Sequence, residues 1–283
     1  MDIIDQSTIN GLLALGVTFV IITGGIDLSI GSIFAVVIVV IGNFLVQGLV
    51  APVAIIAGCI VGAVLGAING IVITKMKLQP FIATLGTMSV YRGCAYIITG
   101  GWPVLNIPKS FRNLMDGAVF LNISSAIFIL IIFAVICFIL LKFTKFGTFL
   151  LAIGGNEEAT RLSGVNVDRT KMLAYAFCGI AAALAGMVML ARLGSGEPTA
   201  GQAYEMDAIA ATAIGGASLS GGRGSVIGTF LGAILLSTLK VGLVVVGVDS
   251  FWQYVATGAI IVVAAYFEIL QSKLSGLSFL KKK

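Results

Sequence analysis

The residues whose types and spacing could do chemistry gather in one polar stretch, residues 142–171 (KFTKFGTFLLAIGGNEEATRLSGVNVDRTK). Its centre has the pattern of a short helix. Asn156 is a suitable N-cap, the acids that follow suit the positive end of the helix dipole, and Gly164 suits the position after the last turn. Glu157 and Arg161 are four residues apart in the favourable order and should face each other. Such a helix displays charges for docking and contains no catalytic pair.

Long apolar runs enclose this stretch, at residues 120–141 before it and 172–191 after it. A short turn would be enough to connect two such runs, so a connection of this size suggests a function of its own. A helix of about eight residues is marginal in water by itself. Either its own membrane domain or a partner protein should therefore hold it, and we expect the partner. The Gly154-Gly155 pair before it should act as a swivel.

The chain has no histidine, which excludes histidine-ligated metals and histidine proton relays. Its four cysteines stand singly in apolar runs and are interpreted as small buried hydrophobic residues: Cys59, Cys94, Cys137 and Cys178. The sequence therefore predicts no metal site and no cofactor.

The composition is that of a membrane protein. Of 283 residues, 59% are hydrophobic and 10% charged, whereas soluble domains have about 25% charged residues. We expect an all-α polytopic membrane protein in which residues 1–283 form a single domain. A span needs about 20 apolar residues, which gives nine candidates: 7–27, 29–49, 51–73, 80–100, 120–141, 172–192, 205–221, 224–247 and 250–271.

The distribution of lysine and arginine fixes the orientation, because cytoplasmic loops carry an excess of both. With 142–171 in the cytoplasm, the inner ends hold twelve basic residues: Lys75, Lys77, Lys142, Lys145, Arg161, Arg169, Lys171, Arg223, Lys273 and Lys281 to Lys283. The outer ends hold only Lys109, Arg112 and Arg192, while Arg92 and Lys240 fall inside spans. The parity of nine spans then places the C-terminus inside and Met1 outside. A polar outer N-terminus without a signal peptide is unusual, so we expect one further span ahead of it, ten in all.

Two breaks in the apolar pattern supply candidates for a translocation pathway. The first, GGIDLSIGS at residues 24–32, contains Asp27 and Ser29. It is either a tight cytoplasmic turn or a discontinuous helix that lines a cavity. The second, residues 209–225, is rich in glycine and includes Gly215 and Gly216. It lacks the lysine of a phosphate-binding loop, so we interpret it as a small-residue segment that re-enters or crosses beside the pathway.

Span 80–100 is too polar to face lipid on all sides, because it contains Thr84, Thr87, Tyr91 and Arg92. An ionisable residue inside a span is a functional candidate, although Arg92 could also snorkel or pair with a structural acid. Asn69, in the preceding span, either lines a pore or forms a hydrogen bond between helices.

Glycines every four residues in span 51–73 form a smooth stripe, at Gly58, Gly62, Gly66 and Gly70. We interpret the stripe as a close helix–helix contact. Span 224–247 has a weaker version of it, at Gly228 and Gly232.

Three segments together resemble one family: GGIDLSIGS (24–32), AIGGNEEATRLSGVNV (152–167) and ARLGSGEPTAGQAYEMDAIAATAIGGASLSGGRGS (191–225). They are similar to bacterial ABC importer permeases of the monosaccharide type, which include ribose, galactoside, xylose and autoinducer-2 permeases. The resemblance covers about residues 6–270.

This resemblance implies a membrane-spanning subunit that forms the pathway for a sugar, with ribose first and galactose, xylose or autoinducer-2 as alternatives. The implied partners are ATP-binding ABC subunits, a second permease copy (identical or homologous) and a periplasmic or lipid-anchored sugar-binding protein, all at the bacterial plasma membrane. ATP hydrolysis would belong to the partner subunit. The cytoplasmic coupling helix falls on Gly154, Gly155, Asn156, Glu157, Glu158, Ala159, Arg161 and Gly164. The acidic external segment after span 172–192 supplies candidates for docking of the binding protein: Glu197, Pro198 and Glu205.

The main alternative is an ion-coupled secondary transporter. It would need carboxylates inside the membrane, and Asp27, Asp207 and Glu268 all lie near span ends. A channel is a further alternative function, because glycine-rich breaks also suit a pore. A membrane-embedded enzyme is disfavoured, because the chain lacks histidine and a carboxylate cluster within a span.

Overall fold

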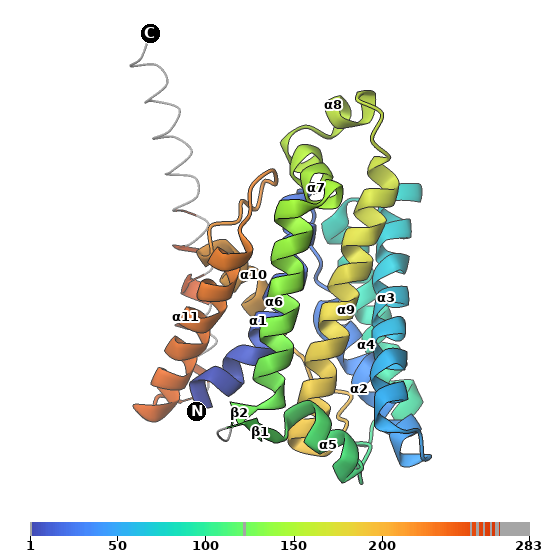
Figure 1. Ribbon diagram of the computed structural model, residues 1–283, viewed down its shortest axis with the longest axis vertical. Helices are drawn as coiled ribbons and strands as arrows, with labels where there is room; N and C mark the ends of the chain where they lie inside the picture. Colours follow the sequence, from blue (N-terminus) through green and yellow to red (C-terminus); the bar gives the residue numbers. More distant parts are fainter. Residues whose placement is uncertain are drawn as a thin grey trace.

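The protein is a bundle of long helices that run roughly side by side (Figure 1), as a computed structural model shows. The structure describes residues 2–120 and 123–249, together with 251–252, 255–256, 258–260, 262–263 and 266. The elements in order are α1 (Asp2–Ile22), α2 (Ile30–Val46), α3 (Ala51–Lys75), α4 (Pro80–Thr99), α5 (Lys109–Asp116), β1 (Ala118–Phe120), β2 (Ile123–Ser124), α6 (Ser125–Phe143), α7 (Lys145–Gly155), α8 (Glu157–Leu162), α9 (Val167–Leu193), α10 (Tyr204–Ile214) and α11 (Val226–Val245). The strands β1 and β2 form one small antiparallel hairpin.

Helices α1, α2 and α9 form the centre of the bundle. The residues of α1 from Gly11 to Ile22 and those of α2 from Ile30 to Val39 are all buried. A helix that is apolar on every side belongs in a core, and α9 packs along both of these helices and along α3. In the surrounding helices α3, α4, α6 and α11, at most a third of the residues in the most apolar stretch are buried.

The glycine stripe of α3 packs on α9, as the sequence predicts. A Cβ added to Gly62 would lie 2.3 Å from the Gly179 carbonyl oxygen, and one added to Gly66 would lie 2.1 Å from that of Tyr175. Only glycine permits backbones this close. The weaker stripe of α11 packs on α10 in the same way, because Gly232 faces the Ala211 carbonyl oxygen.

Among the described residues, five helices are long and apolar enough to cross a membrane: α3, α4, α6, α9 and α11. The apolar parts of α1 and α2 are shorter. The expected all-α polytopic fold is thus confirmed. The predicted span 250–271 lies largely outside the described residues.

The prediction of a span at residues 205–221 is wrong. The helix α10 ends at Ile214, and the chain then turns through Gly216, Gly221 and Gly222, all with positive φ. Left-handed backbone cannot continue an α-helix, so α10 has about half the length of a span. The expectation of a small-residue segment that crosses describes this region better, because Gly196 pairs with Val104 at one end of the bundle and Gly222 bonds to Ile22 at the other.

The polar stretch 142–171 also differs from its prediction. It holds two helices, because α7 occupies residues that were expected to be loop, and α9 begins at Val167 and not at residue 172. Thr144 explains the start of α7, since its hydroxyl accepts a hydrogen bond from the Gly147 amide.

The two ends of the bundle are chemically different. Helices α7 and α8 lie at one end, and α5 with the β1–β2 hairpin lies at the opposite end (Figure 1). The α8 end includes Lys75, Arg161 and Lys171, which share ion pairs there. Lys109, Arg112 and Arg192 instead lie together at the α5 end. This separation matches the orientation that the basic residues predict.

Candidate functional site

The short helix α8 is built as the sequence predicts, although it has six residues and not eight. The Asn156 side chain caps it, with Oδ1 accepting a hydrogen bond from the Ala159 amide at 2.9 Å. Ser163 follows the last turn, and Gly164 has φ of +86°, a conformation that favours glycine. The backbone amide of Gly164 donates to the Arg161 carbonyl, which closes the helix end.

A chain of ion pairs attaches α8 to the membrane bundle. Arg161 bridges Glu157 at 3.2 Å and Asp168 at 3.1 Å. Asp168 also pairs with Lys75 at the end of α3, and Glu157 pairs with Lys171 on α9. Partial burial raises the pKa of Glu157, but the hydrogen bonds and charges of Lys171 and Arg161 outweigh it, so the net pKa lies below its ordinary value.

The chain's own residues therefore hold α8, whereas the sequence analysis expected a partner to do so. Each exposed ion pair contributes little alone, but here the pairs share members and form a network. The network leaves part of α8 open: Glu158 is exposed, and the Leu162 side chain is 84% exposed. An exposed leucine beside charges, on a rigidly attached helix, is a surface suited to contact with another protein.

Gly154, predicted as half of a swivel, is a close-packing point. A Cβ on it would lie 1.9 Å from the Ile22 carbonyl oxygen and 2.2 Å from the Gly222 amide nitrogen. The Gly222 amide also donates to the Ile22 carbonyl at 2.9 Å. Gly155 faces open space. The end of α7 is thus packed against the end of α1 and the loop after α10. A displacement of α8 would therefore be transmitted to α7, to α1 and to this loop.

Most of the predicted pathway residues come together, but inside the protein. Asp27 Oδ1 accepts hydrogen bonds from the Ser29 amide and hydroxyl, at 2.9 and 2.7 Å. Asn69 on α3 donates to the Ser29 hydroxyl at 2.7 Å and accepts from the Tyr91 hydroxyl of α4 at 3.2 Å. All four side chains are buried. For Asn69, the interpretation as a bond between helices is supported.

This polar cluster supports non-helical backbone between α1 and α2. The Thr84 hydroxyl donates to the Ile26 carbonyl at 3.2 Å. Thr87, one turn later on α4, bonds only within its helix, to the Thr84 carbonyl. Irregular backbone inside a membrane protein needs such partners. The stretch is therefore a discontinuous segment packed in protein, and not a tight turn at the surface.

Arg92 joins this break to another irregular segment, residues 194–203. Its guanidinium donates to the carbonyls of Pro198 and Ala200, at 2.7 and 2.6 Å, and to that of Gly31 at 3.1 Å. The segment 194–203 enters from the α5 end, where Val104 pairs with Gly196. It then reaches Gly31, at the start of α2. Arg92 thus ties two carbonyls of the irregular segment 194–203 to the first turn of α2.

The remaining predicted residues are placed as follows. Gly215, at the end of α10, packs against Gly228 of α11, and Gly216 forms the turn that follows. Glu205 is 9% exposed and lies against Gly31, and Pro198 is also buried. Of the three docking candidates, only Glu197 is partly exposed.

Sequence reasoning missed a buried ion pair between Lys240 on α11 and Asp207 on α10. The side chain of Asp207 is 7% exposed. The sequence did contain a signal, because Lys240 and Asp207 are both ionisable residues in apolar segments. They are 33 positions apart, however, so the sequence did not show that they pair. Hydroxyls of Thr18, Thr212 and Thr229 link the same helices to α1.

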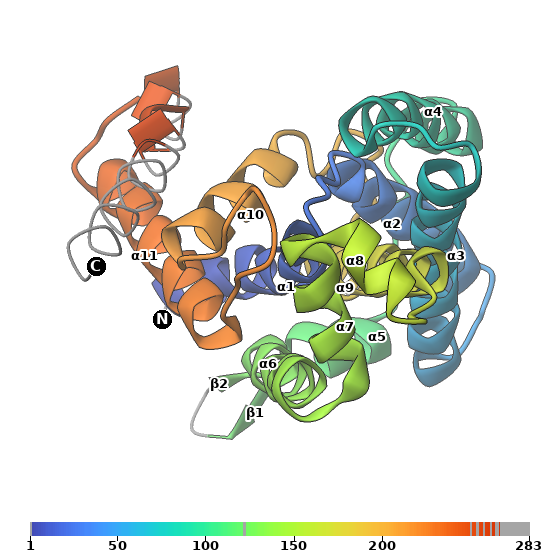
Figure 2. The ribbon, with the colours of Figure 1, turned by 90° about the horizontal axis from the view of Figure 1, so that it is seen from above.

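The outward face of α4 carries further small and polar residues of the predicted span 80–100. Ser89 and Cys94 are exposed there, and nothing lies within 4 Å of a Cβ added to Gly86 or Gly93. This helix is the least hydrophobic of the five span-length helices. The exposed faces of α3 and α6 consist mainly of large apolar residues, and α4 also exposes Ile82, Val90 and Ile97. Seen from above, α4 stands at the rim of the bundle (Figure 2). Small residues and one hydroxyl therefore alternate with aliphatic side chains on this face, which suits contact with another helix inside the membrane.

Comparisons with known proteins agree on one family. Residues 1–265 match the family described as "Branched-chain amino acid transport system / permease component". The Ribose import permease protein RbsC of Bacillus subtilis is 46% identical over 269 residues, which is 95% of this chain and 84% of that protein. RbsC of Escherichia coli K12 is 40% identical, over 93% of this chain and 83% of its own length. The Xylose transport system permease protein XylH of Haemophilus influenzae is 33% identical, over 96% and 89%. No solved structure matches.

Proposed function

We propose a function from the premise that this chain belongs to the branched-chain amino acid transport system permease component family, and within it to the ribose-type permeases of ABC monosaccharide importers. It is the membrane subunit of a sugar importer. As the substrate we propose ribose, because relatives that are 46% and 40% identical are named ribose import permeases. Galactose, xylose and autoinducer-2 are the alternatives.

The proposed complex lies in the bacterial plasma membrane, with the chain as one multi-pass membrane domain. It contains two permeases, identical or homologous, and two ATP-binding subunits or one fused double subunit. A periplasmic or lipid-anchored protein delivers the sugar, and ATP hydrolysis belongs to the ATP-binding subunits. In this complex, the chain forms the pathway for the sugar and takes up the movement of the ATP-binding subunits.

The observation that carries the proposal is the construction of α8. It is exposed on one side through Leu162 and Glu158, and attached on the other through Arg161 and Asp168. A rigid connector of this kind can transmit closure of an ATPase to the bundle, which would then rock between outward-open and inward-open forms. The contact of Gly154 with Ile22 extends that connection to the central helix α1.

The geometry also changes the proposed pathway. The Asp27, Ser29, Asn69 and Arg92 side chains form hydrogen bonds within the protein, so we assign them to positioning the break between α1 and α2 and the segment 194–203. We assign the pathway to the outward face of α4, with a second permease copy completing it from the other side. A neutral sugar needs hydroxyl partners there and no counter-ion, and Ser89 supplies one such partner.

Uptake of radiolabelled sugar by proteoliposomes tests the function. The chain is reconstituted with its ATP-binding subunits and the sugar-binding protein, and ATP is enclosed on the α8 side. The proposal expects ribose accumulation that needs both partners and ATP. Accumulation driven by a proton or sodium gradient, with no ATP-binding subunit present, would contradict it. Competition by unlabelled galactose and xylose ranks the substrates.

A further inference from the structure

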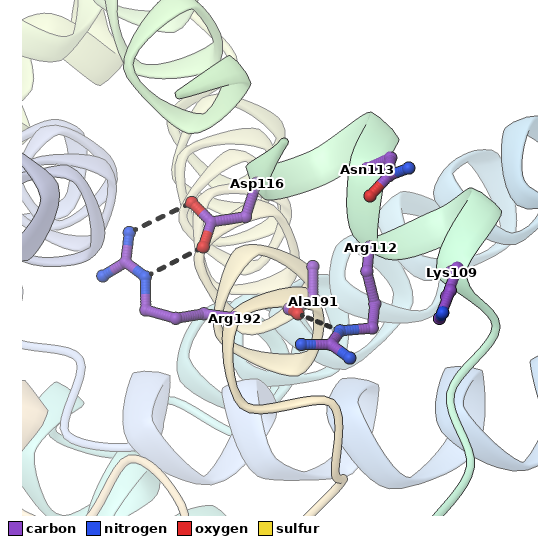
Figure 3. Close-up of a pocket in the computed structure, with 6 residues that line it drawn as sticks. All are labelled: Lys109, Arg112, Asn113, Asp116, Ala191 and Arg192. Atoms are coloured by element: carbon purple, nitrogen blue, oxygen red, sulfur yellow. Dashed lines mark hydrogen bonds and ion pairs between the residues drawn. The ribbon is translucent and has the colours of Figure 1, made fainter. Parts of the chain in front are cut away.

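A charged pocket of about 250 Å³ lies at the α5 end of the bundle. Helix α5 and the last turn of α9 line it with Lys109, Arg112, Asn113, Asp116, Ala191 and Arg192 (Figure 3). Five of these six side chains are polar or charged. The pocket lies at the opposite end from α8, which is the external face if α8 meets an ATPase in the cytoplasm.

The lining contains all three basic residues that the sequence predicts on the outer side of the membrane: Lys109, Arg112 and Arg192. External loops tend to be poor in lysine and arginine. Chance would scatter three such residues over several loops. Instead, Arg192 comes from α9 and the other two from α5, and all three meet at one pocket.

Internal contacts use part of this charge. Asp116 binds Arg192 through both carboxylate oxygens, at 3.1 and 3.3 Å, which fastens α5 to α9. Arg112 donates through Nε to the Ala191 carbonyl at 3.0 Å, near the negative end of the α9 dipole. Among the residues that the structure describes, no acid pairs with Lys109 or Arg112. Two positive charges are therefore left uncompensated beside an open pocket.

The lining favours a protein carboxylate over a lipid phosphate. A bound phospholipid needs an apolar groove for its acyl chains beside the basic groups, and Ala191 is the one apolar residue in this lining. The pocket also sits at the end of α9, the most buried of the span-length helices. It thus lies over the inner part of the bundle, where a protein approaching from outside would meet it.

We propose that this pocket receives an acidic side chain of the sugar-binding protein and so guides the docking of that protein. This inference rests on the proposed function, because it takes the binding protein from there. Lys109 and Arg112 supply the attraction, and the Asp116–Arg192 pair holds α5 in place. Charges at the rim of an interface mainly raise the association rate and make it sensitive to salt.

Surface plasmon resonance tests the proposal, with the permease complex in nanodiscs and the sugar-loaded binding protein in solution. Lys109→Glu should weaken binding about threefold to tenfold, chiefly through a slower association rate, and should reduce its dependence on salt. Arg112→Gln should act in the same direction. Lys109 has no ion pair in the described structure, so its replacement leaves the fold intact.

Ser110→Glu is the matched control. Ser110 is exposed on α5 but does not line the pocket, and this variant lowers the net charge by one unit, as Arg112→Gln does. Its binding should stay within about twofold of the unaltered protein. Equal losses of affinity in Ser110→Glu and Arg112→Gln would overturn the proposal. They would indicate that binding responds to the net charge of this end of the protein and not to the pocket.

Two other results would also overturn it. Unchanged association of Lys109→Glu, while sugar uptake still requires ATP and the binding protein, would reject this pocket and leave the proposed function in place. A Lys109→Glu defect that appears only in anionic-lipid nanodiscs, with normal binding-protein affinity in neutral ones, would assign the pocket to a lipid headgroup.

Discussion

At the scale of single residues, the glycines of α3 set how close two helices lie. Gly66→Ala would place a Cβ 2.1 Å from the Tyr175 carbonyl oxygen, so α3 and α9 would have to separate. We expect a loss of about 1–3 kcal/mol in stability, the usual cost of overpacking. Gly86→Ala on α4 is the control, because its Cβ meets open space. Thermal unfolding in detergent should show a lower midpoint for the first variant only, and equal midpoints would contradict this packing.

Residue types revealed the polar groups but not their surroundings. The sequence singled out Asp27, Asn69 and Arg92 because polar residues in a span need partners. It could not say whether those partners were water, sugar or protein, since that depends on how each helix is rotated. Arg92 illustrates the point, because its partners are backbone carbonyls, which a one-dimensional pattern of side chains does not display.

At the scale of elements, α8 is the part whose capping the sequence predicted best. The Asn156 cap, the Glu157–Arg161 pair and the Gly164 end are local features, readable within nine residues. The attachment of Arg161 to Asp168 and of Gly154 to Ile22 depends on tertiary packing and was missed. The half-length of α10 was missed for a similar reason, because composition alone does not show where glycines adopt positive φ.

Reversing one charge tests the attachment of α8. Arg161→Glu would place a carboxylate beside Glu157 and Asp168, and the repulsion should loosen α8 from α9. We expect sugar uptake to fall at least severalfold, with ATP hydrolysis by the partner less affected. Arg169→Glu is the matched control, since Arg169 is exposed and belongs to no ion pair among the described residues. Equal uptake in both variants, measured in proteoliposomes, would remove the coupling role of Arg161.

The half-helix α10 depends on its ion pair with α11. Lys240→Met should destabilise the protein by about 3–5 kcal/mol, because it leaves the Asp207 carboxylate buried without its partner. The double variant Lys240→Met, Asp207→Leu should recover most of that loss. The midpoint of thermal unfolding in detergent measures both. A double variant no more stable than the single one would show that the charge itself is needed there.

At the scale of the whole molecule, the account requires the α8 and α5 ends to face opposite sides of the membrane. Cysteines at Ser163 and Ser110, in a background without the four native cysteines, should react with an impermeant maleimide from opposite sides. In intact cells, Ser110→Cys should be labelled and Ser163→Cys should be protected until the membrane is opened. Labelling of both in intact cells would invalidate the topology.

The central claim is that α8 is the contact through which an ATPase drives this bundle. Cross-linking from Leu162→Cys, in the complex assembled with the ATP-binding subunits, tests it most directly. The account predicts a covalent adduct between this position and the ATP-binding subunit, with a yield that changes when ATP is added, and none from Ser110→Cys. A fully assembled, transporting complex that gives no adduct at Leu162, or gives it at Ser110, would contradict the claim.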